Sequence, residues 1–95
     1  MPAYLVADIE VTDPEGYAEC RRTVGESIAA FGGRFLARGG KTVTLEGNWS
    51  PSRLVIVEFP SIERLQAWYD SPDYAPALAL RKRASVGSLV MTEGI

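Results

Sequence analysis

Residues 68–74, with the sequence WYDSPDY, bring three aromatic side chains and two carboxylates together in seven positions. Buried Trp and Tyr side chains need hydrogen-bond partners for their N–H and O–H groups, and those groups can also orient a bound molecule. The segment equally suits a joint between helices, because Ser71 can cap a helix, Pro72 fits its first position and Asp73 favours its positive end. We therefore interpret it chiefly as a joint with Trp68 in the core, and secondarily as one wall of a pocket.

Arg38 and Glu58 carry charges that could act on a ligand. The planar guanidinium of Arg38 could hold a carboxylate group, or it could pair with a nearby glutamate. Glu58 lies near the end of an apolar segment, where partly apolar surroundings would raise its pKa and make it a candidate general acid or base. A surface ion pair with Arg34, Arg38 or Arg53 is the alternative for Glu58, and we favour it.

Tyr17, Cys20 and Arg81 are further candidates on expected helices. Tyr17 begins the apolar side of the first helix, from which it could face a pocket. Arg81 lies seven residues after Tyr74 and returns to the same helix side, where a solvated or ion-paired role is favoured. Cys20 lies on or beside an apolar helix face, so an inert buried thiol is favoured over a nucleophile.

The composition excludes several classes of protein. A chain of 95 residues forms one domain, residues 1–95, and its 46% hydrophobic content is typical of folded proteins. Twelve acidic and ten basic residues give a net charge of −2, and the basic residues are scattered, so we expect no nucleic-acid partner. No apolar run approaches membrane-spanning length and none follows a charged leader, so we expect a cytoplasmic protein without membrane contact.

The chain contains no histidine, which restricts its possible chemistry further. Ser-His and Cys-His nucleophile pairs, histidine-ligated haem and the commonest zinc sites are all excluded. The single cysteine excludes an internal disulfide. Any catalysis must rest on carboxylates, Tyr, Arg, Lys or the lone thiol, and we expect neither a cofactor nor a metal ion.

Hydrophobic periodicity and turn residues predict an alternation of strands and helices. The first helix is expected to follow a cap at Asp13 and to end at Gly32-Gly33, and the second to follow a cap at Ser61. The third helix is expected to run from Pro72 to about Arg83. The expected strands are residues 3–11, 34–38, 41–46, 53–59 and 86–93, with a loop at 47–52 and a possible break or bulge between 38 and 41.

This order predicts an α+β fold of the ferredoxin-like, split βαβ type with an antiparallel sheet. If residues 3–11 and 53–59 ran parallel, as we take the plan to require, Asp8, Glu10 and Glu58 would lie toward one end of the sheet. Glu93, on an antiparallel strand, would lie toward the other end. A shift of one residue in register would reverse every face.

Both faces of the expected sheet are apolar at their centres. Leu54 and Ile56 point away from the face that carries Val55 and Val57, and other strands divide their apolar residues in the same way. Helices cover only one face in this plan. We therefore expect the sheet of a second copy to cover the other face, giving a homodimer; a monomer with scattered exterior apolar residues is the alternative.

Several segments together resemble the bacterial family DUF1330, a domain of unknown function in the dimeric α/β-barrel superfamily. They are GGRFLARGG, LEG followed by Trp49, VEFPS, and AWYDSPDY with Arg81 beyond it. The resemblance extends over essentially the whole chain. It implies a ferredoxin-like subunit that pairs sheet to sheet into a homodimer, and it implies no particular activity.

The wider superfamily includes cofactor-free monooxygenases, lactone isomerases, haem-degrading enzymes and small dehalogenase-like proteins. The resemblance implies a pocket between the sheet and the helices of each subunit. The haem-dependent pattern cannot be carried over, because this chain has no histidine.

Three hypotheses for function follow. The first is a homodimer that binds a small acidic or aromatic organic molecule in a pocket lined by Tyr17, Arg38, Glu58, Trp68 and Tyr74. The second is a cofactor-free isomerase or monooxygenase on the same pocket, with Glu58 or a neighbouring carboxylate as base and Arg38 stabilising negative charge. The third is a dimeric interaction module with a filled core and no catalysis.

Overall fold

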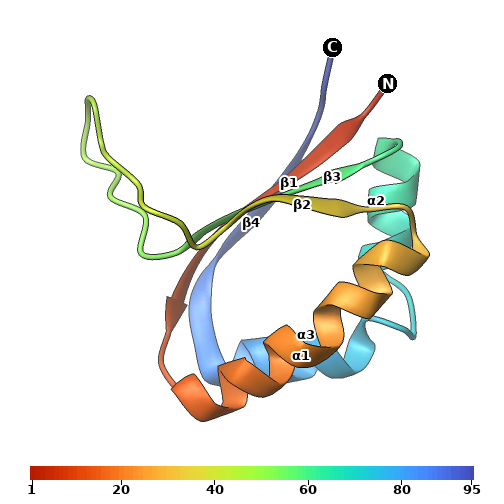
Figure 1. Ribbon diagram of the computed structural model, residues 1–95, viewed down its shortest axis with the longest axis horizontal. Helices are drawn as coiled ribbons and strands as arrows, with labels where there is room; N and C mark the ends of the chain where they lie inside the picture. Colours follow the sequence, from red (N-terminus) through yellow and green to blue (C-terminus); the bar gives the residue numbers. More distant parts are fainter.

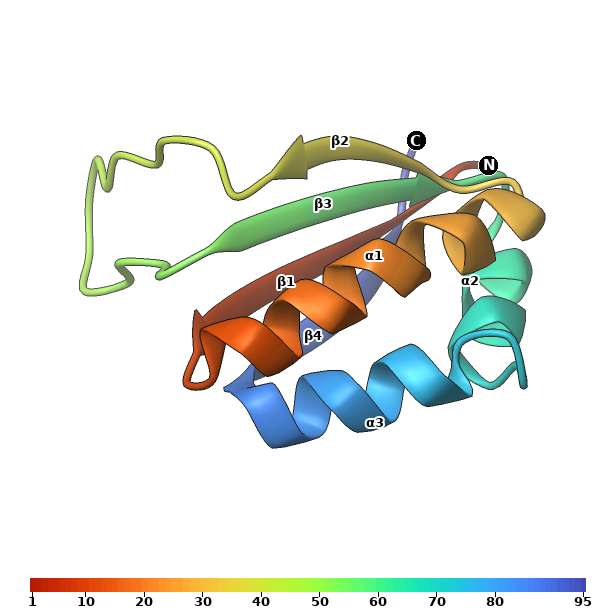
Figure 2. The same cartoon turned by 60° about the horizontal axis from the view of Figure 1, so that its bottom comes forward.

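The computed structural model describes residues 1–95 and has one four-stranded sheet with three helices. The strand order is β2-β3-β1-β4, and every neighbouring pair is antiparallel. All three helices lie on one face of the sheet, with α1 and α3 side by side (Figures 1 and 2). This is the predicted ferredoxin-like α+β plan. The elements are β1 (Ala3–Val11), α1 (Pro14–Ala30), β2 (Arg34–Arg38), β3 (Leu54–Phe59), α2 (Ile62–Tyr69), α3 (Ala75–Ala84) and β4 (Ser85–Glu93).

The two ends of α1 are held in different ways. Its C-terminal end closes as predicted, because Gly32 adopts φ +80° and the Gly33 N–H donates to Ile28 O at 2.9 Å. At its N-terminal end the predicted side-chain cap is wrong, since Asp13 makes no capping hydrogen bond. The backbone N–H groups of Thr12 and Asp13 instead donate to Ala84 O at 2.8 and 3.0 Å, which fastens the start of α1 to the end of α3.

The segment between α2 and α3 is a helix joint, as predicted. The Ser71 hydroxyl accepts from the Tyr74 N–H at 3.2 Å and donates to Trp68 O at 2.7 Å, so it serves both flanking turns. Residues 72–74 form a turn and the regular helix begins only at Ala75, three residues later than predicted. Ser61 caps α2 as predicted, accepting from the Arg64 N–H.

The direction predicted for strands 3–11 and 53–59 is wrong, because β1 and β3 are antiparallel neighbours. A helix crossover makes β1 parallel to β2, and the reversal between β2 and β3 then turns β3 against β1. Glu58 therefore pairs with Tyr4, at the opposite end of the sheet from Asp8, which pairs with Leu54. Glu58 shares its end with Glu93 instead.

The strand predicted at residues 41–46 does not form, and residues 39–53 are a long loop between β2 and β3. The loop extends well beyond the sheet at the end opposite α2 (Figure 1). It returns to the sheet at Asp8, whose carboxylate accepts from the Trp49 indole N–H at 2.8 Å and from the Ser52 N–H at 3.1 Å. The irregularity in β2 lies between Phe35 and Ala37 rather than at Gly39-Gly40.

The core lies between the sheet and the helices, and Trp68 is its largest side chain. The indole centroid is 4.0 Å from the Tyr74 ring and 5.5 Å from the Phe59 ring. Its N–H donates to the Ser27 hydroxyl on α1 at 3.0 Å, so the one polar group of the ring is satisfied inside the core. The prediction that Trp68 is a core residue is confirmed.

The other face of the sheet carries no helix. Val6 and Ile56 are half-buried there, while Val86 and Val90 are 57% and 61% exposed. The apolar centre predicted for this face is therefore present, and nothing in the single chain covers it.

Replacing Trp68 with Ala should lower the free energy of unfolding by about 3–5 kcal/mol, the usual cost of truncating a large buried aromatic. Ser27→Ala keeps the ring but leaves the indole N–H without its partner, and should cost about 1–3 kcal/mol. Urea unfolding followed by far-ultraviolet circular dichroism measures both changes.

Trp49→Ala is the control, because this indole is 59% exposed and lies on the loop. Its loss should change the free energy of unfolding by less than about 1 kcal/mol. A cost for Trp49→Ala equal to that for Trp68→Ala would show that the core is not centred on Trp68.

Candidate functional site

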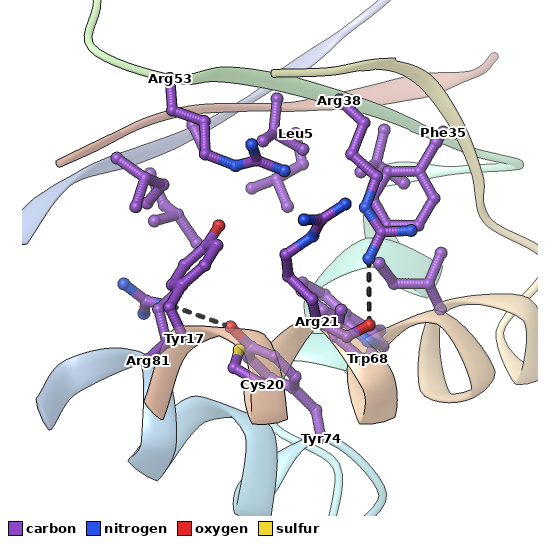
Figure 3. Close-up of a pocket in the computed structure, with 17 residues that line it drawn as sticks. Leu5, Tyr17, Cys20, Arg21, Phe35, Arg38, Arg53, Trp68, Tyr74 and Arg81 are labelled. Carbon is purple, nitrogen blue, oxygen red and sulfur yellow. Dashed lines mark hydrogen bonds between the residues drawn. The ribbon is translucent and has the colours of Figure 1, made fainter. Parts of the chain in front are cut away.

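A cavity lies between the inner face of the sheet and the helices (Figure 3). The centres of water-sized molecules have only about 60 Å³ of it open to them, so an enclosed ligand must be small or must extend through the open mouth. Of the 17 lining residues 13 are hydrophobic, and the other four are Arg21, Arg38, Arg53 and Arg81. The hydrophobic ones are Leu5, Ala7, Ile9, Tyr17, Cys20, Val24, Ile28, Phe35, Val55, Val57, Trp68, Tyr74 and Leu89.

Arg53 is held at one end of the cavity by its backbone, because the Ile9 N–H donates to Arg53 O at 2.9 Å. Its guanidinium carbon lies 5.5 Å from the centre of the Tyr17 ring. The Nε atom is buried and has no hydrogen-bond partner, unlike every other buried side-chain nitrogen or oxygen. An unmet buried donor of a charged group is costly and calls for an explanation.

Gly39 leaves the space that the Arg53 guanidinium occupies. A Cβ atom at residue 39 would lie 2.7 Å from Arg53 Cζ, closer than real side-chain contacts allow. Gly39 also adopts φ +73°, which an L side chain rarely adopts. Glycine at this position therefore lets the guanidinium lie directly against the backbone.

Arg38 enters the cavity from the end of β2. Its guanidinium carbon stacks 4.1 Å from the centre of the Phe35 ring, and Nη2 donates to Arg21 O on α1 at 3.1 Å. Burial lowers the pKa of the Arg38 guanidinium below its ordinary value, and the positive charges of Arg21 and Arg53 lower it further. The guanidinium groups of these three arginines point toward one another across the centre of the cavity (Figure 3).

Tyr74 and Cys20 meet on the helix side of the cavity. The Tyr74 oxygen accepts from Arg81 Nε at 3.2 Å, which leaves its own O–H free to donate. Burial raises the pKa of the Tyr74 phenol, although the hydrogen bond and charge of Arg81 oppose that change. Burial also raises the pKa of the Cys20 thiol, which donates to Ala77 O at 3.4 Å. A buried thiol with a raised pKa is a poor nucleophile.

No carboxylate lines the cavity. The prediction that Glu58 lines it is wrong: the residue points to the opposite face of the sheet, where its Oε1 accepts from Arg34 Nε at 2.8 Å. The favoured alternative, a surface ion pair with Arg34, is what the structure contains. Asp8 also lies on that outer face, against Trp49 and Ser52. Glu58 was misplaced because neither the direction nor the register of strand pairing was fixed by the sequence.

The other four predicted pocket residues, Tyr17, Arg38, Trp68 and Tyr74, do line one cavity. Sequence reasoning missed Arg53, which it considered only as a partner for Glu58, and it missed Arg21. Alternation along β3 was a usable signal, because Arg53 falls on the same strand face as Val55 and Val57.

The chain brings together no group of three or more His, Cys, Asp or Glu side chains that could hold a metal ion. None of its helices has the length and apolar character needed to cross a membrane.

Comparisons with known proteins place the whole chain within one family. The family described as "Domain of unknown function (DUF1330)" matches residues 2–95. No curated protein matches the chain.

Several solved structures share the fold. A protein of unknown function from Rhodopseudomonas palustris is 20% identical, with a TM-score of 0.79 over 99% of this chain and 82% of its own. A cofactor-independent oxygenase from Streptomyces nogalater is 11% identical, with a TM-score of 0.66 over 99% of this chain and 93% of its own. A dimeric ferredoxin-like protein of unknown function from Thermobifida fusca is 18% identical, with a TM-score of 0.65 over 97% of this chain and 90% of its own. At these identities the likeness concerns the fold alone.

Tyr74 should titrate above the ordinary tyrosine pKa near 10, since burial raises its pKa. Arg81→Gln should raise that pKa further, because it removes the hydrogen bond and the charge that stabilise the phenolate. Ultraviolet difference absorbance of tyrosinate during an alkaline titration measures the change. Tyr74→Phe identifies the step by removing it; a lower pKa in Arg81→Gln would contradict the arrangement.

The same raised pKa makes stability depend on pH. The unfolded chain ionises Tyr74 near the ordinary value, while the folded chain still holds the proton. The contribution of Tyr74 to stability is therefore complete below about pH 10 and is lost as the pH rises through the folded-state pKa. Urea unfolding of the wild type and of Tyr74→Phe on both sides of pH 10 checks this sign.

Proposed function

The chain belongs to the DUF1330 family, whose function is unknown, and we propose from its cavity that it binds a small organic anion between sheet and helices. The observation that carries this proposal is the convergence of three guanidinium groups in a cavity that has no carboxylate. Like charges held close together repel one another, and the half-buried Arg38 and Arg53 also lose hydration, whereas Arg21 is exposed. An anion bound between the guanidinium groups would neutralise their repulsion and replace the hydrogen bonds that they lost with water.

The geometry around Arg53 favours a ligand that accepts hydrogen bonds. Arg53 Nε is a buried donor without a partner, and a guanidinium can hold a carboxylate through two parallel hydrogen bonds. The Tyr17 and Phe35 rings each lie against one guanidinium, which limits how those groups can turn. The apolar remainder of the lining suits the carbon skeleton of an organic molecule better than a fully hydrated ion.

The two other hypotheses have less support. An isomerase or monooxygenase that uses a carboxylate base would need one in the cavity, and neither Glu58 nor any other acidic residue lines it. An interaction module was expected to have a filled core, whereas this core contains a cavity. Binding is therefore the function that we propose, with catalysis not required.

We propose in addition that the protein is a homodimer that pairs the helix-free faces of two sheets. Val6 and Ile56 lie at the centre of that face, and Val86 and Val90 extend it to the edge strand. A small domain with a thin core gains stability when such a face is covered. The dimeric ferredoxin-like protein from Thermobifida fusca, which shares the fold, supports a dimer.

Isothermal titration calorimetry with benzoate, succinate and inorganic phosphate as probes tests the proposed function. At least one of these anions should bind, and Arg53→Ala and Arg38→Ala should each weaken it at least about tenfold, the usual worth of a hydrogen bond between charged groups. Arg64→Ala is the charge-matched control, since Arg64 lies exposed on α2 and away from the cavity.

Equal weakening by all three substitutions would indicate a loss of general positive charge and not a site. If none of the probes binds, or if binding is indifferent to both cavity arginines, the proposal is wrong.

Val90→Asp should convert the homodimer into a monomer, because it places a charge within the apolar interface, beside Val6. Val90 is exposed in the single chain, so the substitution should not unfold it. Size-exclusion chromatography with light scattering should give about twice 10.3 kDa for the wild type and 10.3 kDa for the variant. Ala79→Asp, on the exposed side of α3, is the control and should remain dimeric. A wild-type mass of 10.3 kDa would refute the dimer.

A further inference from the structure

The cavity is cationic at one end of the sheet and apolar at the other. We count levels as successive inward-facing positions along the strands. Arg53 lies beside Ile9 at the first level, and Arg38 pairs with Val55 at the second. One level further, Phe35 pairs with Val57 and the charged side chains stop. Since side chains on one face of a strand recur every second residue, these levels follow each other along the strands.

The helix side repeats this gradient. Helix α1 begins at the end of the sheet where β1 ends and runs back along the sheet toward α2 (Figure 2). Its cavity-lining residues change in that direction from Tyr17 and Arg21 to Val24 and Ile28. The sheet and α1 therefore both place their positive charges at the end of the cavity near Arg53, and this end attracts negative charge.

The apolar end offers a ligand no free charged donor. The Trp68 N–H is already bonded to Ser27, and Arg81 lies toward the other end of the cavity, beside Tyr17 (Figure 3). At the cationic end the Nε of Arg53 is buried and unpaired. A second carboxylate placed at the apolar end would lose its hydration without gaining a charged partner, which is strongly unfavourable.

The cavity therefore matches one class of anion. A bare phosphate ion would leave the apolar end unfilled, and a dicarboxylate would bury its second charge there. A molecule with one carboxylate and a small apolar body satisfies both ends at once. The small enclosed volume limits the size of that body, unless part of it extends through the mouth.

Building on the proposed function, we propose that the ligand is a monocarboxylic acid with a small apolar body. Its carboxylate accepts hydrogen bonds from the Nε edge of Arg53, beside the Arg38 guanidinium. Its body lies along the strands toward Phe35 and Trp68. Aryl and short alkyl acids share this chemistry, and the experiment below distinguishes them.

Calorimetry on the wild-type protein with a matched set of probes tests the class. Benzoate, cyclohexanecarboxylate and butyrate represent flat, bulky and linear bodies, while benzamide removes the charge and succinate adds a second one. At least one monocarboxylate should bind ten times or more tightly than succinate, phosphate and benzamide. The preferred body then identifies the aryl or alkyl source.

Two variants test the orientation. Arg53→Ala should abolish the preference for benzoate over benzamide, because it removes the guanidinium that binds the carboxylate. Val24→Thr has nearly the same shape but puts a hydroxyl in the apolar wall, and should weaken the monocarboxylate severalfold while leaving phosphate binding unchanged. In two-dimensional NMR spectra the Trp68 indole N–H signal should shift with the monocarboxylate and not with phosphate.

The possible failures are distinguishable. If succinate or phosphate binds as tightly as every monocarboxylate, and does so through Arg53, the ligand class is wrong while anion binding stands. If no probe binds in an arginine-dependent way, both proposals fail. A monocarboxylate that binds without shifting the Trp68 signal would overturn the orientation. This measurement uses the wild-type protein, so it decides the orientation even if Val24→Thr does not fold.

Discussion

The burial of the Trp68 indole is the constraint on which the cavity depends. One ring packs against Tyr74 and Phe59 and donates its N–H to Ser27, so it ties the joint after α2, strand β3 and helix α1 together. The opposite end of the helix layer is fastened where residues 12 and 13 donate to Ala84 O. With both ends fixed, the space between helices and sheet is held at its width, and the cavity lies in the part that apolar side chains do not fill.

The side chains that line that space carry positive charge only. Three guanidinium groups converge, no carboxylate opposes them, and one of their donors is buried without a partner. Arg38 and Arg53 are half-buried and Arg21 is exposed, so water screens their mutual repulsion only in part. Acidic residues are not scarce in the chain, but Glu58 and Asp8 lie on the other side of the sheet.

Antiparallel pairing separates these charges. Each strand alternates its side chains between the two faces, so Arg53 and Arg38 fall on the helix side while Glu58 and Arg34 pair on the other. The same alternation leaves valine and isoleucine at the centre of the helix-free face. One sheet thus carries a cationic, partly apolar face toward the cavity and an apolar face that no helix covers.

The sequence alone determined the order of elements, the helix joint at residues 68–74, the core position of Trp68 and four of the cavity residues. These follow from local signals: periodicity, turn residues and caps act over a few positions. Strand direction, the long loop at residues 39–53 and the exclusion of Glu58 came only from the tertiary structure. They depend on which strands become neighbours and in what register, and those pairings are set by packing between residues far apart in the chain. Arg53 shows the difference most clearly, because its type was visible in the sequence but its unpaired, buried guanidinium edge exists only once Gly39 and Tyr17 lie against it.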